Sequence, residues 1–432
     1  MNDVFWQLAG YDLGKSRQII QELQNMSKES YWEMQKMRRN SIFEYHYQNT
    51  IWYNNYCRKF EKHIWENIPV IKKQDYQEYV PRFGNNFRRK LYSANTSGSS
   101  GEPFSFYKDK FCHSLAWAKN QMSYYKLGIL ENDKEARFFG HVKGSLGTHI
   151  YEFGKDLFLN RYRLDIFDNS EEKFMEYLKV FKKKKFSYIY GYTNVILEFS
   201  KFLQTNKLKP LTNYCPTLKC CIVTAEMCSK QDRLIIEDAI GIPVYNEYGT
   251  SETSIIALED RQLNWKISTD RLWVEILNEE NKPVNNGEIG KIVITDIFNQ
   301  AFPFIRYEIG DTGSIEDYNE YPYLILKELS GRISDTIYLP SGKKSPGLSF
   351  YYVTRSIFEK STNIREFKII QKEKDFILFQ IVSKLELNDD EKKIIFDETA
   401  KYLEPGLNIS FERVDKIQKK YSGKNQHFFS EI

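Results

Sequence analysis

The fold is decided by a stretch between Ser187 and Glu252, in which strand-like apolar runs alternate with helical patterns. Its successive segments are SYIYGYTNVILEFSKFL (187–203), TLKCCIVTAE (217–226), SKQDRLIIEDAIG (229–241) and IPVYNEYGTSE (242–252). The strand-like runs are short, rich in β-branched and aromatic residues, and end in polar or glycine-containing turns. Such strand–turn–helix alternation predicts a largely parallel sheet with ligand-binding groups at the carboxyl ends of its strands.

The sequence before this stretch has a different character. Residues 1–90 are dominated by mixed apolar and charged residues without strand alternation, and they predict a helical lead-in. The glycine-rich segment 135–154 predicts a loop, and a helix follows at 170–186, with Ser170 as its partial cap.

The sequence after Glu252 predicts short strands and hairpins, then two alternating strands in 367–387 and a helix capped near Asp389 or Asp390. These patterns predict an α/β protein. A large N-terminal domain of mixed and parallel sheets and helices is expected at 1–331, and a small α+β domain at 332–432.

The overall charge is nearly balanced, with 62 basic and 58 acidic residues and a net charge of +4. This balance gives no argument for nucleic acid or an anionic membrane as a partner. The basic run FKKKKF (181–186) is better explained as the solvated end of a helix than as a nucleic-acid patch. Because the chain has no apolar segment of about 18 residues and no signal-peptide pattern, we expect a cytoplasmic protein without membrane insertion.

The six cysteines show no disulfide-like framework. Cys215, Cys220, Cys221 and Cys228 lie close in sequence, which raises zinc binding as an alternative. Their spacing is not a repeated CxxC pair, and the run CCIV is typical of a buried strand. Free cysteine in such a strand behaves as a small apolar residue, which is the favoured interpretation.

The stretch NTSGSSGEP (95–103) combines hydroxyl groups, an amide and two glycines before the first apolar residue, Phe104. Small residues let backbone N–H groups approach an anion, and the hydroxyl groups add donors. The stretch lacks the GxxxxGK[ST] pattern of a P-loop. Taken alone, it is explained better by a plain surface turn than by a phosphate site.

Four later stretches change this interpretation: YGTSE (248–252), IRYEIGD (305–311), GRISD (331–335) and SGKNQHF (422–428). With NTSGSSGEP, and in this order, they resemble the motif set of the adenylate-forming superfamily. The wording RYEIGD, the turn GSLG (144–147) and the run IYGYTNVILEF resemble its phenylacetate–CoA ligase branch, including the capsule-biosynthesis CapK-like proteins. The resemblance covers about residues 90–430 and implies a large adenylate-forming domain followed by a small mobile lid domain.

The resemblance implies that the chain joins a carboxylic acid to AMP, using ATP and Mg²⁺, and then transfers the acyl group to CoA. Carboxylate attack on the α-phosphate brings two anions together, so donors and cations must neutralise their charge. The phosphate loop is implied to consist of Thr96, Ser97, Gly98, Ser99, Ser100 and Gly101. Ser99 and Ser100 replace the usual threonines and keep the donor groups.

The resemblance also assigns roles around the nucleotide. Tyr248 is implied to stack on adenine, Gly249 to belong to the ATP/AMP site, and Thr250 to approach the α-phosphate, while Glu252 is implied to bind Mg²⁺ through carboxylate oxygen. Asp311 would accept hydrogen bonds from the two ribose hydroxyls. Two arginines have open roles: Arg306 supports the site or contacts phosphate, and Arg332 contacts the nucleotide or forms an ion pair between domains.

The resemblance implies that the small domain moves between the two half-reactions. Lys424 would bridge the carboxylate and the α-phosphate during adenylation. Ser334 occupies the hinge position, where the family usually has Asp or Lys. The acid pocket is implied to lie near His141, Tyr190, Tyr192 and Glu226, although each tyrosine alone is better explained as a structural aromatic residue.

Other functions remain open at this stage. The acyl group could pass to a sugar amine or hydroxyl group, or to a carrier protein, in capsular polysaccharide synthesis. A non-catalytic nucleotide-binding relative is a further alternative, against which the retained Glu252, Asp311 and Lys424 argue. The resembled branch includes dimers, so a homodimer is among the expectations.

Replacing Lys424 by alanine should abolish acid-dependent exchange of pyrophosphate into ATP, because the variant lacks the cation that offsets charge in adenylation. Use of presynthesised acyl-AMP should stay nearly intact, since that step needs no bridge to the α-phosphate. Both half-reactions would be measured separately on the purified variant. Exchange at the wild-type rate would refute the role of this lysine.

Overall fold

A computed structural model describes residues 6–58 except 8, 64–78, 91–95, 105–139, 146–166, 170–317, 324–332, 336–346 except 343, 357, 363–417 except 416, and 428–432. The chain separates into two compact units. The first comprises Met1–Gly287, Val293–Ile309 and Ile315–Lys327, and the second comprises Glu288–Ile292, Gly310–Ser314 and Glu328–Ile432. The domain boundary between residues 331 and 332 stays a prediction. None of the described helices is both long and apolar enough to cross a bilayer.

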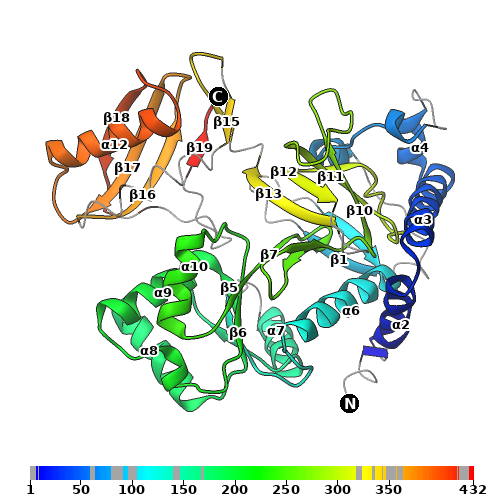
Figure 1. Cartoon of the computed structure of the whole chain (residues 1–432), viewed down its shortest axis with the longest axis horizontal. Helices are drawn as coiled ribbons and strands as arrows, with labels where there is room; N and C mark the ends of the chain where they lie inside the picture. Colours follow the sequence, from blue (N-terminus) through cyan, green and yellow to red (C-terminus); the bar gives the residue numbers. More distant parts are fainter. Residues whose placement is uncertain are drawn as a thin grey trace. The chain divides into compact units, whose positions relative to one another are not determined.

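The first unit begins with helices that pack together and onto the sheet (Figure 1). The described helices of this unit are α2 (Leu13–Gln24), α3 (Lys28–Asn49), α4 (Ile51–Cys57), α6 (Lys110–Lys126), α7 (Leu146–Phe158), α8 (Glu171–Lys183), α9 (Thr193–Thr205) and α10 (Lys230–Ile240). Side-chain caps fix several of their starts, because the first backbone N–H groups of a helix lack partners within it. Asp12, Ser27, Asp109 and Ser170 each accept a bond from a backbone N–H in the first turn of the following helix.

The central sheet contains 11 strands in the order β10-β11-β12-β13-β9-β8-β7-β6-β5-β3-β4. These strands are β3 (Glu135–Phe138), β4 (Arg161–Leu164), β5 (Tyr188–Tyr192), β6 (Cys220–Thr224), β7 (Val244–Thr250), β8 (Ser254–Glu259), β9 (Trp265–Ile267), β10 (Leu272–Leu277), β11 (Gly290–Asp296), β12 (Tyr307–Asp317) and β13 (Leu324–Arg332). Strands β4, β3, β5, β6 and β7 pair in parallel, whereas β8 is antiparallel to β7. The predicted parallel arrangement is therefore confirmed for these five strands, and the sheet as a whole is mixed.

Helices α8, α9 and α10 lie together on one side of strands β5 and β6 (Figure 1). The side chains between them form one apolar core, which includes the fully buried Phe181, Ile189, Phe199 and Val223. The opposite side of the same strands packs against the end of α6 through Leu127. Both faces of the parallel strands are covered, which explains why their sequences are continuous apolar runs.

The predicted loop at 135–154 is wrong. Residues 135–138 form the largely buried strand β3, and residues 146–158 form helix α7. The glycines that suggested a loop are compatible with this arrangement, since Gly154 lies on an open side of α7, with no atom within 4 Å of the point that a Cβ would occupy. Tertiary packing of β3 between β4 and β5 outweighs the local glycine signal.

The second unit is a small α+β structure, as predicted. Its sheet has the order β18-β17-β16-β19, with β16 (Ile364–Gln371) antiparallel to β17 (Phe376–Ser383). The remaining elements are β14 (Thr336–Tyr338), β15 (Lys344–Pro346), β18 (Asn408–Arg413), β19 (Phe428–Ser430) and α12 (Asp389–Tyr402). Helix α12 is capped by Asn388, one residue before the predicted position, in a capping box with Glu391.

Replacing Gly191 by alanine should destabilise the first unit by about 3 kcal/mol, because overpacking a tight core site is costly. A Cβ at this position would lie 2.5 Å from the Phe138 Cβ and 2.6 Å from the Phe138 carbonyl oxygen. Urea unfolding of the purified variant would measure the loss.

The matched control is Gly154→Ala. No atom lies within 4 Å of a Cβ at this position in helix α7, so the control should be neutral or stabilising by about 0.5–1 kcal/mol. Equal unfolding midpoints for Gly191→Ala and the wild type would contradict the close contact between β5 and β3.

Candidate active site

The YGTSE motif forms the end of β7 and the turn into β8. Tyr248 is buried, and its ring lies edge-on to Trp265 with 6.4 Å between ring centroids. Gly249 is required by packing, because a Cβ there would lie 2.6 Å from the carbonyl oxygen of Ser254. The motif therefore sits at the carboxyl end of a strand that runs parallel to its neighbour β6 and to β5 beyond it, where α/β proteins bind ligands.

Thr250 and Glu252 are ordered by contacts within and beyond this turn. The Thr250 hydroxyl group accepts a bond of 3.1 Å from the Thr253 N–H and lies 3.0 Å from the Thr253 hydroxyl group. Glu252 is buried, and its Oε1 accepts a bond of 3.2 Å from the Tyr307 hydroxyl group. Magnesium in nucleotide sites takes one or two protein carboxylates together with substrate phosphates. The buried Glu252 carboxylate, two residues after Thr250, fits this mode of binding.

Asp311 lies in β12 and is buried. It follows Gly310, whose φ of 85° is in the left-handed region that glycine adopts without penalty. Asp311, the residue predicted to bind ribose, therefore follows a backbone conformation that a residue other than glycine at position 310 would adopt only with strain.

Arg306 is fully buried and directs its donors to the protein backbone. Its Nη1 donates to the Glu66 carbonyl at 2.8 Å and to the Ile68 carbonyl, and its Nε lies 3.5 Å from Glu275 Oε1. These contacts tie the segment after α4 to the sheet. They favour the supporting role among the two that the sequence left open.

The tyrosines of the expected acid pocket surround Phe139. The Tyr190 ring stacks on Phe139 with a centroid distance of 5.4 Å, and Tyr192 lies 4.4 Å from the same ring. The Tyr190 hydroxyl group donates to Glu247 Oε1 at 2.7 Å, and the Tyr124 hydroxyl group donates to Oε2 at 2.6 Å. Burial raises the pKa of Tyr190 and of the Glu247 carboxyl group.

Glu226, which was expected in the acid pocket, binds the first residues of helix α9. Its Oε2 accepts a bond of 2.9 Å from the Asn194 N–H, and its carbonyl accepts one of 3.0 Å from the Thr193 hydroxyl group. The carboxylate therefore caps the start of α9, where a negative charge is favourable.

Several predicted residues lie outside the described part of the chain: Thr96, Ser97, Gly98, Ser99, Ser100, Gly101, His141, Ser334 and Lys424. The backbone of Arg332 belongs to β13. Strands β1 (Leu91–Asn95) and β2 (Ser105–Asp109) pair antiparallel, with Asn95 opposite Ser105. The expected phosphate loop therefore joins two directly paired strands.

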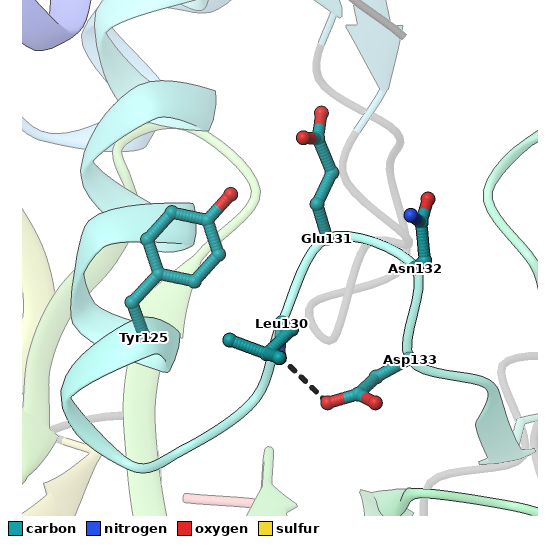
Figure 2. A pocket seen from close by; sticks show the side chains of 5 residues that line it. All are labelled: Tyr125, Leu130, Glu131, Asn132 and Asp133. Atoms are coloured by element: carbon teal, nitrogen blue, oxygen red, sulfur yellow. Dashed lines mark hydrogen bonds between the residues drawn. The ribbon is translucent and has the colours of Figure 1, made fainter. Parts of the chain in front are cut away.

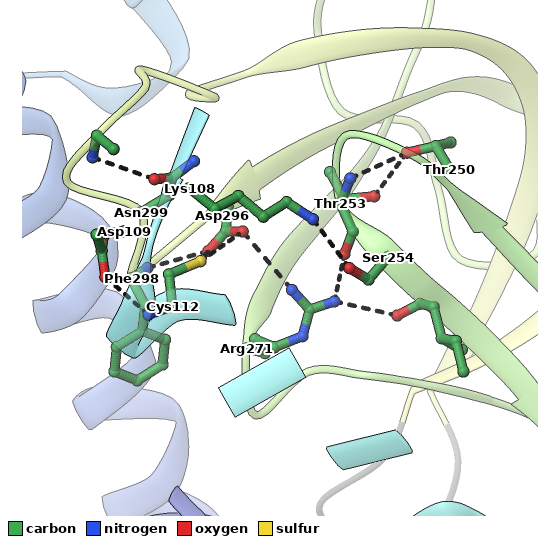
Figure 3. Close-up of polar contacts among 12 residues, drawn as sticks. Lys108, Asp109, Cys112, Thr250, Thr253, Ser254, Arg271, Asp296, Phe298 and Asn299 are labelled. Atoms are coloured by element: carbon green, nitrogen blue, oxygen red, sulfur yellow. Dashed lines mark hydrogen bonds and ion pairs between the residues drawn. The ribbon is translucent and has the colours of Figure 1, made fainter. Parts of the chain in front are cut away.

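Sequence reasoning missed a buried charged cluster next to the YGTSE turn (Figure 3). Lys108 Nζ donates to the Ser254 hydroxyl group at 2.9 Å and to the Ser251 carbonyl at 3.4 Å. Arg271 donates to the carbonyls of Thr253 and Ile255, and its Nη1 lies 3.6 Å from Asp296 Oδ2. A lysine at an inward position of a short strand was the available signal, since β2 buries Phe106 and Lys108 on the same face.

The cysteines do not converge on a metal site. Cys220 and Cys221 belong to different apolar clusters on the two faces of β6. Within the described residues, no group of three His, Cys, Asp or Glu side chains is arranged to hold a metal ion. Burial raises the pKa of the thiols of Cys220, Cys221 and Cys228, as expected for apolar packing.

A surface pocket of about 420 Å³ lies beyond the end of α6. Figure 2 shows its lining residues, which are Tyr125, Leu130, Glu131, Asn132 and Asp133. The Asp133 carboxylate already accepts bonds from the Leu130 N–H at 2.7 Å and from Lys219 Nζ at 2.5 Å. None of the predicted site residues that the structure describes lines this pocket.

Comparison with known proteins extends these observations. Residues 348–431 match the family described as CapK C-terminal domain. The chain is 25% identical to Protein CapK of Staphylococcus aureus over 443 residues, covering 95% of this chain and 94% of that protein. A solved 2-hydroxyisobutyryl-CoA ligase, in the postadenylation state with 2-HIB-AMP, matches with a TM-score of 0.72 and 16% identity over 95% of this chain and 91% of that one.

Residues 348–431 are thus similar to a CapK C-terminal domain, the chain is similar to Protein CapK over nearly its whole length, and its fold is that of the 2-hydroxyisobutyryl-CoA ligase. The predicted architecture, with a large N-terminal part and a small C-terminal part, is thereby confirmed. The chain also matches the amide bond synthetase McbA from Marinactinospora thermotolerans, with a TM-score of 0.52 and 13% identity over 76% of this chain and 65% of that one. At these identities the solved structures establish the fold.

Replacing Arg306 by methionine should lower the free energy of unfolding by about 3–5 kcal/mol, because it removes a buried cation from the partly buried Glu275 and the donor from the Glu66 and Ile68 carbonyls. Urea unfolding would measure this loss, with the exposed Arg58→Met as control, for which a change within about 0.5 kcal/mol is expected. Unchanged stability together with a loss of ATP affinity would instead indicate a phosphate contact.

Proposed function

We propose that this CapK-like chain is an AMP-forming carboxylate ligase that activates an acid with ATP and transfers the acyl group to CoA. The observation that carries the proposal is the match, over nearly the whole chain, to a CoA ligase whose structure contains an acyl-adenylate. The buried Glu252 and the ordered Thr250 at the carboxyl end of β7 support it, because they form the type of site that the reaction needs.

In the first half-reaction, an oxygen of the acid carboxylate bonds to the α-phosphorus, and the bond from that phosphorus to the β-phosphate oxygen breaks. Pyrophosphate leaves, and an acyl-adenylate remains. Thr250 would donate to the α-phosphate, and Glu252 would hold Mg²⁺. When bound, Mg²⁺ supplies positive charge beside the phosphates. The loop from Thr96 to Gly101 would hold the leaving phosphates through backbone N–H and hydroxyl donors.

Separate residues would bind the base and the sugar of the nucleoside. Tyr248 and Gly249 would contact adenine, and Asp311 would accept bonds from both ribose hydroxyl groups. Arg332 would contact the nucleotide, and Lys424 would bridge the attacking carboxylate and the α-phosphate. Arg306 would support the site by fixing the backbone around it.

In the second half-reaction, the sulfur of CoA bonds to the acyl carbon as the bond to AMP breaks, and AMP leaves. A 2-hydroxyisobutyryl-CoA ligase with this fold has been solved with 2-HIB-AMP and CoA in a thioesterification state. We propose that Ser334 serves as the hinge for the accompanying domain movement. The acid would lie near Phe139, Tyr190 and Tyr192, with His141 and Glu226 close by.

A second candidate acceptor is an amine or hydroxyl group, of a sugar or of a carrier protein in capsular polysaccharide synthesis. The fold match to an amide bond synthetase supports it, because that match indicates that the fold is not restricted to thiol acceptors. We further propose that the chain acts in the cytoplasm and forms a homodimer. The six free, buried cysteines are consistent with a reducing compartment.

The proposal predicts that the purified chain releases pyrophosphate from ATP only when a suitable carboxylic acid is present. A panel of aryl, hydroxy and amino acids would be tested with Mg²⁺, with Glu252→Gln as the inactive control. AMP release that depends on CoA would support CoA as the acceptor, and release that depends on an amine or hydroxyl compound would support the second candidate. The absence of acid-dependent release across the panel would contradict the proposed ligase.

A further inference from the structure

Lys108 occupies a position where an apolar side chain would be expected. In β2 the inward positions are Phe106 and Lys108, which are 0% and 1% exposed. Moving an ammonium group from water into a protein interior costs several kcal/mol unless polar partners compensate. A lysine in this place therefore needs a reason that packing does not supply.

Among the described residues, the hydrogen-bond partners of the Lys108 ammonium group belong to one turn. Its Nζ donates to the Ser254 hydroxyl group at 2.9 Å and to the Ser251 carbonyl at 3.4 Å (Figure 3). Within the described part of the chain, Lys108 forms no ion pair with a carboxylate. The ammonium group thus binds the two ends of the segment that contains Glu252.

This turn has a conformation that needs support. Ser254 has a φ of 63°, in the left-handed region, which costs about 1–2 kcal/mol for a residue other than glycine. Arg271, which directly precedes β10, donates to the same turn through the carbonyls of Thr253 and Ile255. Two buried cations therefore fix the backbone between Thr250 and Ile255.

Electrostatics connects Lys108 with Glu252. Burial lowers the pKa of Lys108 to about 8, and Arg271 also lowers it, while Cys112, Asp296 and Glu252 act in the opposite direction. The negative charge of Glu252 therefore favours the ammonium form of Lys108.

We propose that Lys108 is a positioning residue of the ATP site, whose ammonium group holds the Ser251–Ser254 turn so that Thr250 and Glu252 face magnesium-bound ATP. This inference rests on the proposed function. Lys108 acts through the turn and need not touch the nucleotide.

The test compares Lys108→Met with Lys110→Met, a neighbouring lysine whose Nζ donates to the Tyr11 hydroxyl group at 2.9 Å. Calorimetry with ATP and Mg²⁺, without acid, gives binding constants in the absence of turnover. Lys108→Met should weaken binding at least about tenfold, since a hydrogen bond from a charged group contributes about 1.5–3 kcal/mol. Lys110→Met should bind like the wild type. The proposal would be overturned if a folded Lys108→Met variant bound ATP with an affinity within about twofold of the wild type. Equal losses of ATP affinity in both variants would overturn it as well.

A double-mutant cycle separates positioning from general destabilisation. On a Glu252→Gln background, Lys108→Met should have a much smaller effect on binding, because the group that it positions has already lost its charge. Full additivity of the two effects would overturn the proposal. If Lys108→Met does not fold, the test uses Ser254→Ala, which removes the hydroxyl group that accepts the bond from Lys108. Several-fold weaker ATP binding by Ser254→Ala supports the proposal, and unchanged ATP binding overturns it.

The same titrations distinguish the inference from the proposed function. If the wild type does not bind ATP with Mg²⁺, the proposed function fails, and this inference fails with it. If the wild type binds and the Lys108 and Ser254 variants bind equally well, the inference alone fails and the proposed function stands.

Discussion

The carbonyl oxygen of Ser254 lies so close to the end of β7 that only glycine fits at position 249. This contact arises where the sheet changes from the parallel pair β6 and β7 to the antiparallel pair β7 and β8. The chain must reverse within a few residues, and the reversal places Ser254 in a left-handed conformation. Thr250 and Glu252 lie inside this reversal, so the geometry of the candidate site follows from the packing of two adjacent strands.

Buried charges surround this part of the sheet. Arg233 binds both oxygens of Glu259 at 2.8 and 2.7 Å, and Glu259 in turn accepts a bond of 2.6 Å from the Asn246 N–H in β7. Such pairs contribute little net stability compared with apolar packing, because desolvation offsets their attraction. Their directional bonds instead favour one arrangement of α10, β7 and β8. Loss of one partner would leave an unpaired charge in the interior.

The sequence was sufficient to predict the parts of the fold in which local pattern and tertiary packing agree. The run from Ser187 to Glu252 became strands β5, β6 and β7 with helices α9 and α10, because continuous apolar runs are typical of strands covered on both faces. Segment 135–154 was mispredicted, since its glycines are a local signal and the burial of β3 depends on strands far along the chain.

The candidate site shows the same division between local pattern and tertiary packing. The partners of Arg306 could not be predicted, because the carbonyls of Glu66 and Ile68 lie about 240 residues earlier in the chain. Lys108 escaped notice because a lysine in a polar, aromatic strand suggests a surface position, and its burial is decided by distant strands and helices.

The burial of all six cysteines has a practical consequence. Thiolates are the reactive species, and burial keeps the pKa of Cys112, Cys220, Cys221 and Cys228 above its ordinary value. The folded native chain is therefore a poor substrate for maleimide reagents. A cysteine introduced at an exposed position such as Leu385 could carry a fluorescent label without removal of the natural thiols, which gives direct optical access to the small C-terminal unit.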